Sequence, residues 1–536
     1  MPRTRPAAPA TVTATAAYRD RWRGRRVWLA AFVGFVALGG AWLLATPLGA
    51  PPDEPSHINR AYALVHGDVI GSPPGAGQPA AVTAVEVPAG LDALQAVAQC
   101  ANADVRRPAT CDNRVVGSSR LVPHLIYTGR YPPLYYALVG LPTLVASTPG
   151  VVYWMRLVSV ALSAAFFASA LVVACRRSRS VAGPLAVALA VTPTALYLAA
   201  AVNPSGLEIS SAAALWVALT VLARDRPPDP GGEVTLAGIS AVVLVLARGD
   251  SPLWPVLMIV CLLPLVAGGD LRGLLARRDV RAWAVRIAAA YAAAVGWVLG
   301  EDALAALPVG PRTHTTALHL LRQVVDEMPR WGREYVGVFG AVNAPSPRGV
   351  IAGFGVLAAA LVLAALARGD NRARLSVAAT VAAAAVVPVV LEVIQSRRIG
   401  LGAQGRYFLP LVVAVVLVPG LLMPAPAGPA RRRRWARRGG WLLVGAAGAG
   451  QVAAFAGALR RYSVGVAGPH NPFVTVAAGW RPPLPAGALD LLYAAGVAGV
   501  GGCLAAAWRR RSAPPGETRP TRAVGQLDPE YKADLT

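Results

Sequence analysis

Residues 27–48 read VWLAAFVGFVALGGAWLLATPL and contain no charged side chain. A helix needs about 20 mostly apolar residues to cross the hydrocarbon core of a bilayer, so this stretch is long enough to span one. Arg25 and Arg26 come directly before it, and the polar sequence PPDEPSH (51–57) follows it closely. The stretch therefore predicts a membrane helix that begins in the cytoplasm and delivers a polar segment to the other side.

The composition extends this interpretation to the whole chain. Of its 536 residues, 55% are hydrophobic and 15% are charged. Soluble globular chains carry about 25% charged residues, which excludes an ordinary soluble enzyme. The chain has 51 basic and 27 acidic residues, and Lys532 is its one lysine. This arginine bias, with much Ala, Gly and Pro, indicates a GC-rich bacterial genome, and we expect no nucleic-acid partner.

The predicted fold is an all-α polytopic membrane protein with about twelve transmembrane helices. The apolar stretch 234–269 is interrupted by RGDSP (248–252) and is interpreted as a hairpin of two short spans. The segment 131–148 is just long enough to span, so the count ranges from about 11 to 13. The other predicted spans are 27–48, 152–175, 181–202, 204–223, 283–300, 350–367, 375–394, 407–423, 441–459 and 487–507.

The distribution of basic residues decides the orientation. With twelve spans and a cytoplasmic N-terminus, the inside tracts hold 31 of the 51 basic residues, as the positive-inside rule requires. If 131–148 crossed the membrane, CRRSR (175–179) and RRRRWARR (431–438) would lie outside. We therefore interpret 131–148 as a helix in the outer interface of a bacterial plasma membrane, with both termini cytoplasmic.

This topology divides the chain into four parts, and the outer face is where we expect the chemistry. The inside tracts are short and carry no phosphate-binding glycine loop, so an ATP-driven pump is poorly supported. The parts are a basic cytoplasmic N-terminus (1–26), a transmembrane core (27–425) with extracytoplasmic loops 49–151 and 301–349 that hold interfacial helices, C-terminal transmembrane helices (426–507) and a disordered cytoplasmic tail (508–536).

Two adjacent carboxylates stand where the first span leaves the membrane. Asp53 and Glu54 are followed by His57 and Arg60, one or two helical turns further on. Desolvation at a low-dielectric boundary raises a carboxylate's pKa, which suits a general base. Asp53 and Glu54 are therefore the candidate catalytic residues, and His57 and Arg60 are candidates for substrate binding. The alternative is that Asp53 or Ser56 merely caps a helix that begins here.

A second polar group lies at the outer end of the tenth span. The sequence QGRYFLP (404–410) follows Arg397 closely. An arginine held at the headgroup level by aromatic neighbours can donate paired hydrogen bonds to a lipid phosphate. Arg397, Gln404, Arg406 and Tyr407 are therefore candidate substrate-binding residues. The alternative is an interfacial anchor for the helix end.

Further candidates lie at two other span ends. Glu208, in NPSGLE (203–208), would sit about one turn inside the fourth span, where a carboxylate is expensive and faces a partner or a cavity. It either lines a site together with Asn203 or forms a structural pair with Arg156. Arg130 and Tyr131, at the entrance of the segment 131–148, complete the predicted substrate-binding set.

The histidines and cysteines indicate little metal or redox chemistry. His314 and His319 are five residues apart, which is poor spacing for two ligands on one helix face, and no metal site is predicted. A divalent ion shared by Asp53 and Glu54 stays open, and no other cofactor is expected. Cys100 and Cys111 lie in one polar loop and could form a disulfide if that loop is extracytoplasmic.

Together these segments resemble the DUF2142 family of bacterial integral membrane proteins. The matching motifs are PDEPSH (52–57), YPPLYY (131–136), NP (203–204) with Glu208, and QGRYFLP (404–410). They run in this order between about residues 27 and 425. The order is more specific than any single motif.

That family in turn resembles the GT-C membrane glycosyltransferases. The resemblance implies a sugar on a polyprenyl phosphate as donor and an envelope glycan or protein as acceptor. It implies that Asp53 acts as catalytic base, with Glu54 as alternate or partner, and that Arg406 lies near the donor phosphate. The segment 131–148 would match a juxtamembrane helix of that fold.

Two other functions stay open from the sequence. The chain could be a transporter or flippase that moves a lipid-linked glycan without transferring its sugar. It could also be a non-catalytic scaffold for envelope assembly, whose basic tracts hold anionic membrane lipid. Because the charged motifs gather at the outer mouth rather than inside several spans, sugar transfer is the leading hypothesis.

The orientation is testable by thiol labelling. Single cysteines are placed next to Asp53 and within 176–180 in a chain freed of its native cysteines. In intact cells, a membrane-impermeant thiol reagent is expected to label only the cysteine next to Asp53. Labelling at 176–180 would mean that the segment 131–148 crosses the membrane, and the predicted outer site would not assemble.

Overall fold

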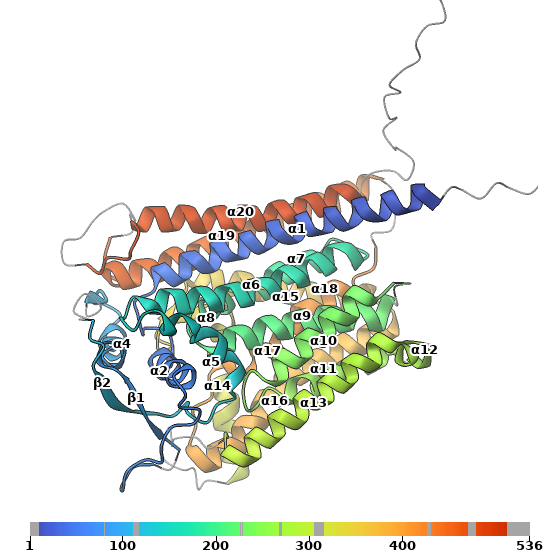
Figure 1. Ribbon diagram of the computed structural model, residues 1–536. Coiled ribbons are helices and arrows are strands. Elements are labelled where there is room, and N and C mark those ends of the chain that lie inside the picture. The colour runs from blue at the N-terminus through green and yellow to red at the C-terminus, as the bar shows by residue number, and fades with distance from the viewer. Residues whose placement is uncertain are drawn as a thin grey trace, which may run out of the picture.

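The protein is a bundle of long helices that run side by side along one axis (Figure 1). The computed structural model describes residues 10–79, 81–110, 117–225, 227, 229–266, 271–304, 316–425, 430–469 and 479–511. The predicted disordered tail lies, from residue 512 on, outside the described residues.

Nine helices in the described part of the chain are long and apolar enough to cross a membrane. A tenth span results if α7 (Ala182–Ala190) and α8 (Pro193–Ala199), which are bent by 58° against each other, count as one. The nine are α1 (Ala10–Ala45), α6 (Val151–Arg177), α9 (Pro204–Asp225), α13 (Arg278–Glu301), α15 (Arg348–Arg368), α16 (Asn371–Ile399), the run of η3 (Gly405–Phe408), α17 (Leu409–Val412) and α18 (Ala414–Leu422), α19 (Ala430–Val464) and α20 (Ala486–Arg511).

The structure departs from twelve full-length spans at the predicted hairpin. Its two helices, α10 (Gly231–Val245) and α11 (Leu253–Val266), have 15 and 14 residues, fewer than the roughly 20 of an ordinary span. The segment 131–148 forms α5 (Pro133–Val139) and the short η2 (Leu141–Leu144). Seven residues of helix rise only about 10 Å, so α5 does not cross a membrane.

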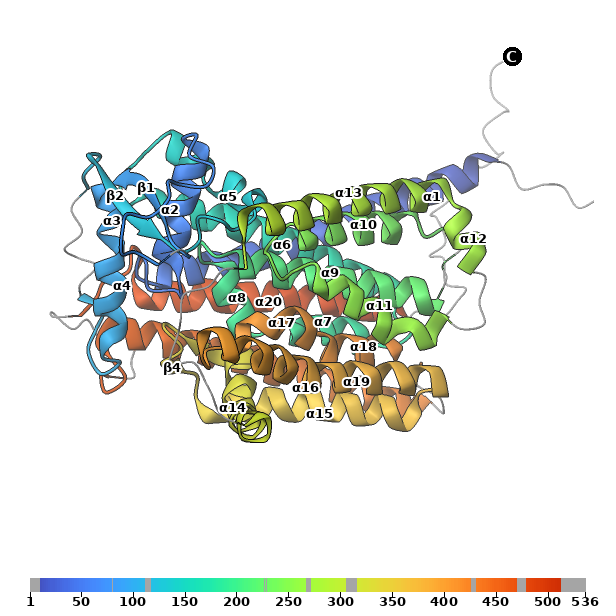
Figure 2. The same ribbon diagram turned by 90° about the horizontal axis from the view of Figure 1, so that it is seen from below.

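One end of the bundle carries a small mixed layer (Figure 2). The loop after α1 forms α2 (Glu54–Val65), α3 (Ala89–Asp92), α4 (Leu94–Ala103) and the antiparallel pair β1 (Thr83–Pro88) and β2 (Leu121–Ile126). The second large loop forms α14 (Ala317–Gly337) and the antiparallel pair β3 (Val338–Phe339) and β4 (Ala344–Pro345). The all-α expectation missed these strands because they are short, although β1 alternates buried and less buried residues over part of its length. At the other end of the bundle lies α12 (Leu271–Ala276).

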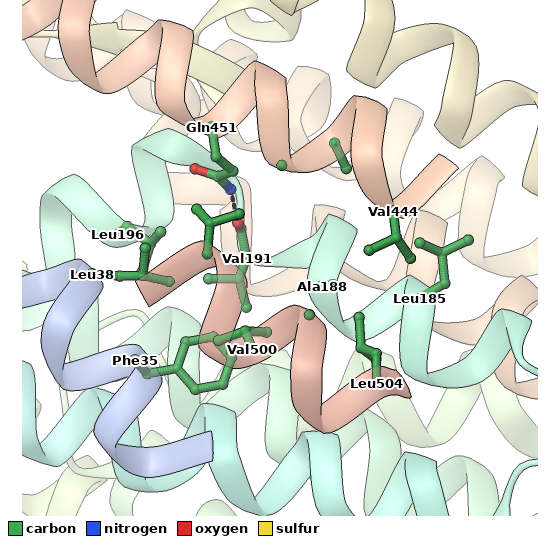
Figure 3. Close-up of a pocket in the computed structure, with 14 residues that line it drawn as sticks. Phe35, Leu38, Leu185, Ala188, Val191, Leu196, Val444, Gln451, Val500 and Leu504 are labelled. Atoms are coloured by element: carbon green, nitrogen blue, oxygen red, sulfur yellow. Dashed lines mark hydrogen bonds between the residues drawn. The ribbon is translucent and has the colours of Figure 1, made fainter. Parts of the chain in front are cut away.

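The break between α7 and α8 exposes a backbone carbonyl inside the bundle, and Gln451 satisfies it. Proline at position 193 has no N–H and begins a new helix, which Thr192 caps by accepting a hydrogen bond from the N–H of Ala195. Gln451 of α19 donates to the carbonyl of Val191 at 2.6 Å and accepts from the hydroxyl of Tyr493 at 2.8 Å. Figure 3 shows this bond at the edge of a pocket lined mainly by aliphatic side chains of α1, α7, α19 and α20.

Close packing around α1 fixes the end of the bundle that carries the mixed layer. A Cβ at Gly39 would come within 2.7 Å of Val160, so only glycine lets α1 and α6 approach this closely. Near its C-terminal end α1 presents Trp42, which lies against aromatic rings of four other elements. Those rings are Tyr197 of α8, Phe339 of β3, Phe455 of α19 and Tyr493 of α20.

A buried ion pair joins the end of α1 to the start of α2. Arg156 of α6 and Glu54 are both fully buried and pair through two hydrogen bonds of 2.8 and 2.5 Å. The same guanidinium donates to the carbonyls of Leu43, Thr46 and Pro47, which the end of α1 leaves without helical partners. The partner of Arg156 is therefore Glu54, whereas the sequence had left a pair with Glu208 open.

Removing one member of this pair is expected to destabilise the protein strongly. Glu54→Gln leaves the Arg156 charge buried without a counter-charge, a change that costs roughly 3–5 kcal/mol. Unfolding of the purified protein by detergent titration, followed by tryptophan fluorescence, measures the loss. The control is Arg179→Gln, because Arg179 is half exposed where it pairs with Asp225, and breaking such a pair costs at most about 1 kcal/mol. Equal stability of the two variants would contradict the assignment.

Candidate functional site

Asp53 lies at the N-cap position, directly before α2, but its side chain does not cap the helix. Its backbone is left-handed (φ 62°, ψ 1°), and its side chain makes no hydrogen bond to the first turn of the helix. Asp tolerates this conformation better than most residues, because its short polar side chain bonds locally. Ser56 does not cap the helix through its hydroxyl either, since that group contacts Thr128 at 3.0 Å. The capping interpretation is therefore wrong for both residues.

The Asp53 carboxylate is held by two side chains from distant parts of the chain. The hydroxyl of Tyr127 donates to Oδ1 at 2.7 Å, and Nη2 of Arg406 donates to Oδ2. Burial alone raises the pKa of Asp53. The charge of Arg406, the two hydrogen bonds and, in the acid range where His57 is protonated, the imidazolium of His57 outweigh burial and lower the pKa to about 2. The side chain is still 35% exposed, so an incoming molecule can reach it.

Arg406 lies on η3, in the turn that opens the span Gly405–Leu422. Its side chain is only 5% exposed. Besides Asp53, Nη2 contacts the hydroxyl of Tyr407 at 3.1 Å. Nε and Nη1 have no hydrogen-bond partner in the described part of the chain. A buried guanidinium with two unused N–H donors is suited to an anion that supplies oxygen acceptors.

The loop before Arg406 is tethered by two buried carboxylates. Glu392 of α16 accepts from the N–H groups of Gly402 and Ala403 at 2.8 and 3.0 Å. Glu334 of α14 accepts from the N–H of Gly405 at 2.5 Å. A Cβ at Gly405 would come within 2.9 Å of the carbonyl of Trp331, so this close approach requires glycine.

Trp331 fastens this loop to α14. Its ring is 1% exposed, and its Nε1 donates to the carbonyl of Ala403 at 3.0 Å. Arg330 donates to the same carbonyl at 2.9 Å. The helix α14 therefore holds Arg406 in place through the loop that precedes it.

Arg248 completes the site, although it lies in an ordinary turn sequence, RGDSP, that does not mark it as a site residue. It lies at the tip of the α10–α11 hairpin, and its guanidinium is 5.1 Å from the centroid of the Tyr407 ring. The guanidinium of Arg406 approaches the same ring at 5.0 Å. Glu208 lies 3.6 Å from Arg248 and accepts from Ser251 and Trp254 of the same hairpin at 2.7 and 2.8 Å. Glu208 therefore positions the hairpin tip.

Residues 36–415 match a family described as predicted membrane proteins, DUF2142. The match covers well over half of the chain. The chain belongs to the DUF2142 family. A search of the curated proteins finds no match. Asp53, Tyr127, Arg248 and Arg406 all lie within the matched residues of this DUF2142 protein.

His57 lies beside the carboxylate in the DUF2142 site as a neutral imidazole. Its Nδ1 is 2.8 Å from the hydroxyl of Tyr136, and its ring is 6.0 Å from that of Tyr131. Burial lowers its pKa, and although Asp53 opposes this, Arg406 and Arg248 reinforce it, so the pKa falls to about 3. Burial likewise raises the pKa of Tyr131 to about 12, so its phenol stays protonated.

Glu54 and two of the substrate-binding candidates, Asn203 and Arg60, hold the backbone around the site in place through hydrogen bonds. Glu54 accepts from Arg156 and from the N–H groups of Gly49 and Val202 at 3.0 and 2.9 Å, so its carboxylate is fully used. Asn203 donates to the carbonyl of Pro52, directly before Asp53, at 2.9 Å. Arg60 is buried and donates to the carbonyls of Val69 and Tyr131.

Three further substrate-binding candidates make no contact with Asp53 or Arg406 that the structure describes. Arg130 contributes its backbone carbonyl to a hydrogen bond from Trp297 at 2.9 Å. Gln404 has a buried Oε1 with no hydrogen-bond partner among the described residues. Arg397 is exposed in the last turn of α16, and no contact joins it to Asp53 or Arg406 in the described ranges.

A divalent ion shared by Asp53 and Glu54 does not fit this arrangement. Glu54 is committed to Arg156 and Asp53 to Arg406, so the two carboxylates turn toward different cations. Within the described residues, no group of three or more His, Cys, Asp or Glu side chains could hold a metal ion. For the predicted disulfide, Cys100 is disulfide-bonded, whereas Cys111 lies outside the described residues.

The imidazole of His57 is expected to stay neutral over the physiological range. With a pKa of about 3, it takes up a proton only far below pH 5, so its charge does not change between pH 8 and pH 5. Nuclear magnetic resonance of protein with labelled histidine measures this, and His57→Gln identifies the signal. A His57 signal that titrates within this range would contradict the buried, cation-flanked environment.

Proposed function

We propose that this protein is a membrane glycosyltransferase of the GT-C type, which transfers a sugar from a polyprenyl phosphate to an envelope glycan or a protein. The observation that carries the proposal is the contact between Asp53 and Arg406, in which a reachable carboxylate lies beside a guanidinium with two unused donors. Such a pair provides a base for the acceptor and a cation for the leaving phosphate.

The proposal includes a topology of twelve spans in a bacterial plasma membrane. The α7–α8 pair counts as one bent span, and α10 and α11 count as two short ones. The basic tracts and both termini then lie in the cytoplasm, as the positive-inside rule favours. The layer of α2, β1, β2 and α14 lies at the outer face, where Asp53 and Arg406 meet lipid-linked substrates.

The reaction is an inverting displacement at the anomeric carbon of the donor sugar. The acceptor hydroxyl oxygen forms the new glycosidic bond while its proton passes to Oδ2 of Asp53. The bond between the anomeric carbon and the phosphate oxygen breaks, and the electron pair leaves with the polyprenyl phosphate. Arg406 stabilises the charge that develops on this phosphate, so no strong acid is needed.

The neighbouring side chains have supporting roles. Tyr407 lies against both guanidinium groups, and Arg248 adds a second cation near the donor. Gln404 lies two residues before Arg406 and has an unused acceptor. Glu54 positions the loop and is not the base, because it is fully buried against Arg156.

The structure does not favour the transporter alternative. A transporter would be expected to keep a carboxylate available within the spans. Glu208, however, is fully buried and committed to Arg248, Ser251 and Trp254. Asp53, in contrast, is 35% exposed at the end of the bundle that carries the mixed layer, where an incoming molecule can reach its carboxylate.

Asp53→Asn is expected to abolish sugar transfer, because an amide cannot accept the proton of the acceptor hydroxyl. Asn also tolerates the left-handed backbone, so expression and membrane insertion stay intact. Transfer from a panel of polyprenyl-phosphate sugars to membrane acceptors measures the effect. Asp104→Asn, at the surface where Asp104 pairs with Arg107, is the control and retains most of the activity. Wild-type transfer by Asp53→Asn would exclude Asp53 as the base.

Arg406→Ala is expected to raise the KM for the donor by about tenfold or more, because a charge-assisted contact to phosphate is lost. The KM for the acceptor changes much less. Steady-state kinetics with each substrate varied in turn separate the two effects. An unchanged donor KM would refute the role of Arg406 at the donor phosphate.

A further inference from the structure

The base and the phosphate-binding cation of the proposed site neutralise each other in this structure. Arg406 holds Oδ2 of Asp53, and Tyr127 holds Oδ1. A carboxylate stabilised in its charged form by a guanidinium is a weak base, because protonation must break the ion pair. The pKa of Asp53, lowered to about 2, expresses the same weakness. As it stands, the site is therefore poorly prepared to deprotonate a hydroxyl.

The two partners of Asp53 belong to separately fixed parts of the chain. Tyr127 follows β2 directly, and the next residue, Thr128, donates to the carbonyl of Ser56 at 2.9 Å and contacts its hydroxyl at 3.0 Å. This double contact locks Tyr127 onto α2, next to Asp53. Arg406 instead depends on the tethers from α14 and α16. A shift of the Arg406 side chain therefore does not require Tyr127 to move.

Arg406 also has unused capacity for a new partner. Its Nε and Nη1 lack hydrogen-bond partners among the described residues, although only 5% of the side chain is exposed. Buried donors without acceptors carry a free-energy cost that an entering anion removes. A phosphate group carries several oxygen acceptors and a negative charge, so it competes directly with Asp53 for the guanidinium.

We propose that the Asp53–Arg406 ion pair is the donor-free resting state, and that the donor phosphate takes over Arg406 and leaves Asp53 as a stronger base held by Tyr127. This inference rests on the proposed function. It makes the order of events compulsory: the donor binds before the acceptor hydroxyl can lose its proton. Tyr127 is then a positioning residue, which keeps the carboxylate aimed at the acceptor once Arg406 has changed partner.

The test measures binding of a polyprenyl monophosphate to the purified full-length protein in lipid nanodiscs, with polyprenol as the uncharged control. Asp53→Asn removes the competitor for Arg406, so this variant is expected to bind the probe about tenfold more tightly than the wild type, or roughly 1.4 kcal/mol. The control Asp104→Asn removes one negative charge at the same end of the molecule, where Asp104 pairs with Arg107 at the surface, and touches neither Arg406 nor Arg248. It therefore measures the general electrostatic gain, which is expected to stay within about twofold.

The outcomes separate this inference from the function on which it rests. Equal affinities of Asp53→Asn and Asp104→Asn would overturn the resting pair, whether or not the protein transfers sugars. Equal affinities of the wild type and Arg406→Ala would instead remove the donor site itself, and with it the proposed function. A third result, tighter binding by Asp53→Asn alone, supports the exchange of partners.

Tyr127→Phe tests the positioning role through kinetics. Its affinity for the polyprenyl monophosphate is expected to equal that of the wild type, since Tyr127 does not contact Arg406 through a hydrogen bond in the described structure. Its kcat falls about tenfold, because the carboxylate is no longer oriented. A rise in donor KM with unchanged kcat would overturn this role.

Discussion

The ion pair between Glu54 and Arg156 is the interaction on which the rest of the structure depends. It satisfies the carbonyls of Leu43, Thr46 and Pro47 at the end of α1 and the N–H groups of Gly49 and Val202. Arg156 and Glu54 are fully buried, and a buried backbone group left without a partner would be costly. Since Asp53 is the neighbour of Glu54, the same contacts decide where the candidate base stands.

Four buried carboxylates around the candidate site act as tethers, whereas Asp53 is partly exposed. Glu54 fixes the first loop, Glu208 fixes the tip of the α10–α11 hairpin, and Glu392 and Glu334 fix the loop before Arg406. Each tether ends close to one side of the same small site. Asp53, left 35% exposed among these fixed parts, is the carboxylate that an incoming molecule can reach.

The sequence motifs pointed to Asp53 and Arg406, the two residues that meet in the candidate site, but not to their neighbours Arg248 and Tyr127. Asp53 and Arg406 were named from local motifs, and they meet across more than 350 positions of the chain. Arg248 escaped notice because RGDSP looks like an ordinary turn between two helices, and Tyr127 because it follows a strand that was not expected.

The sequence by itself determined that the chain crosses a membrane many times and which motifs carry charge to the ends of the spans. Those properties are local, because the thickness of the hydrocarbon core and the cost of burying a charge act on each segment separately. Only the tertiary structure decided that Glu54 is buried while Asp53, one residue earlier, faces outward. That choice depends on Arg156, Tyr127 and Arg406, whose distance from the motif along the chain hides their contacts until the helices pack.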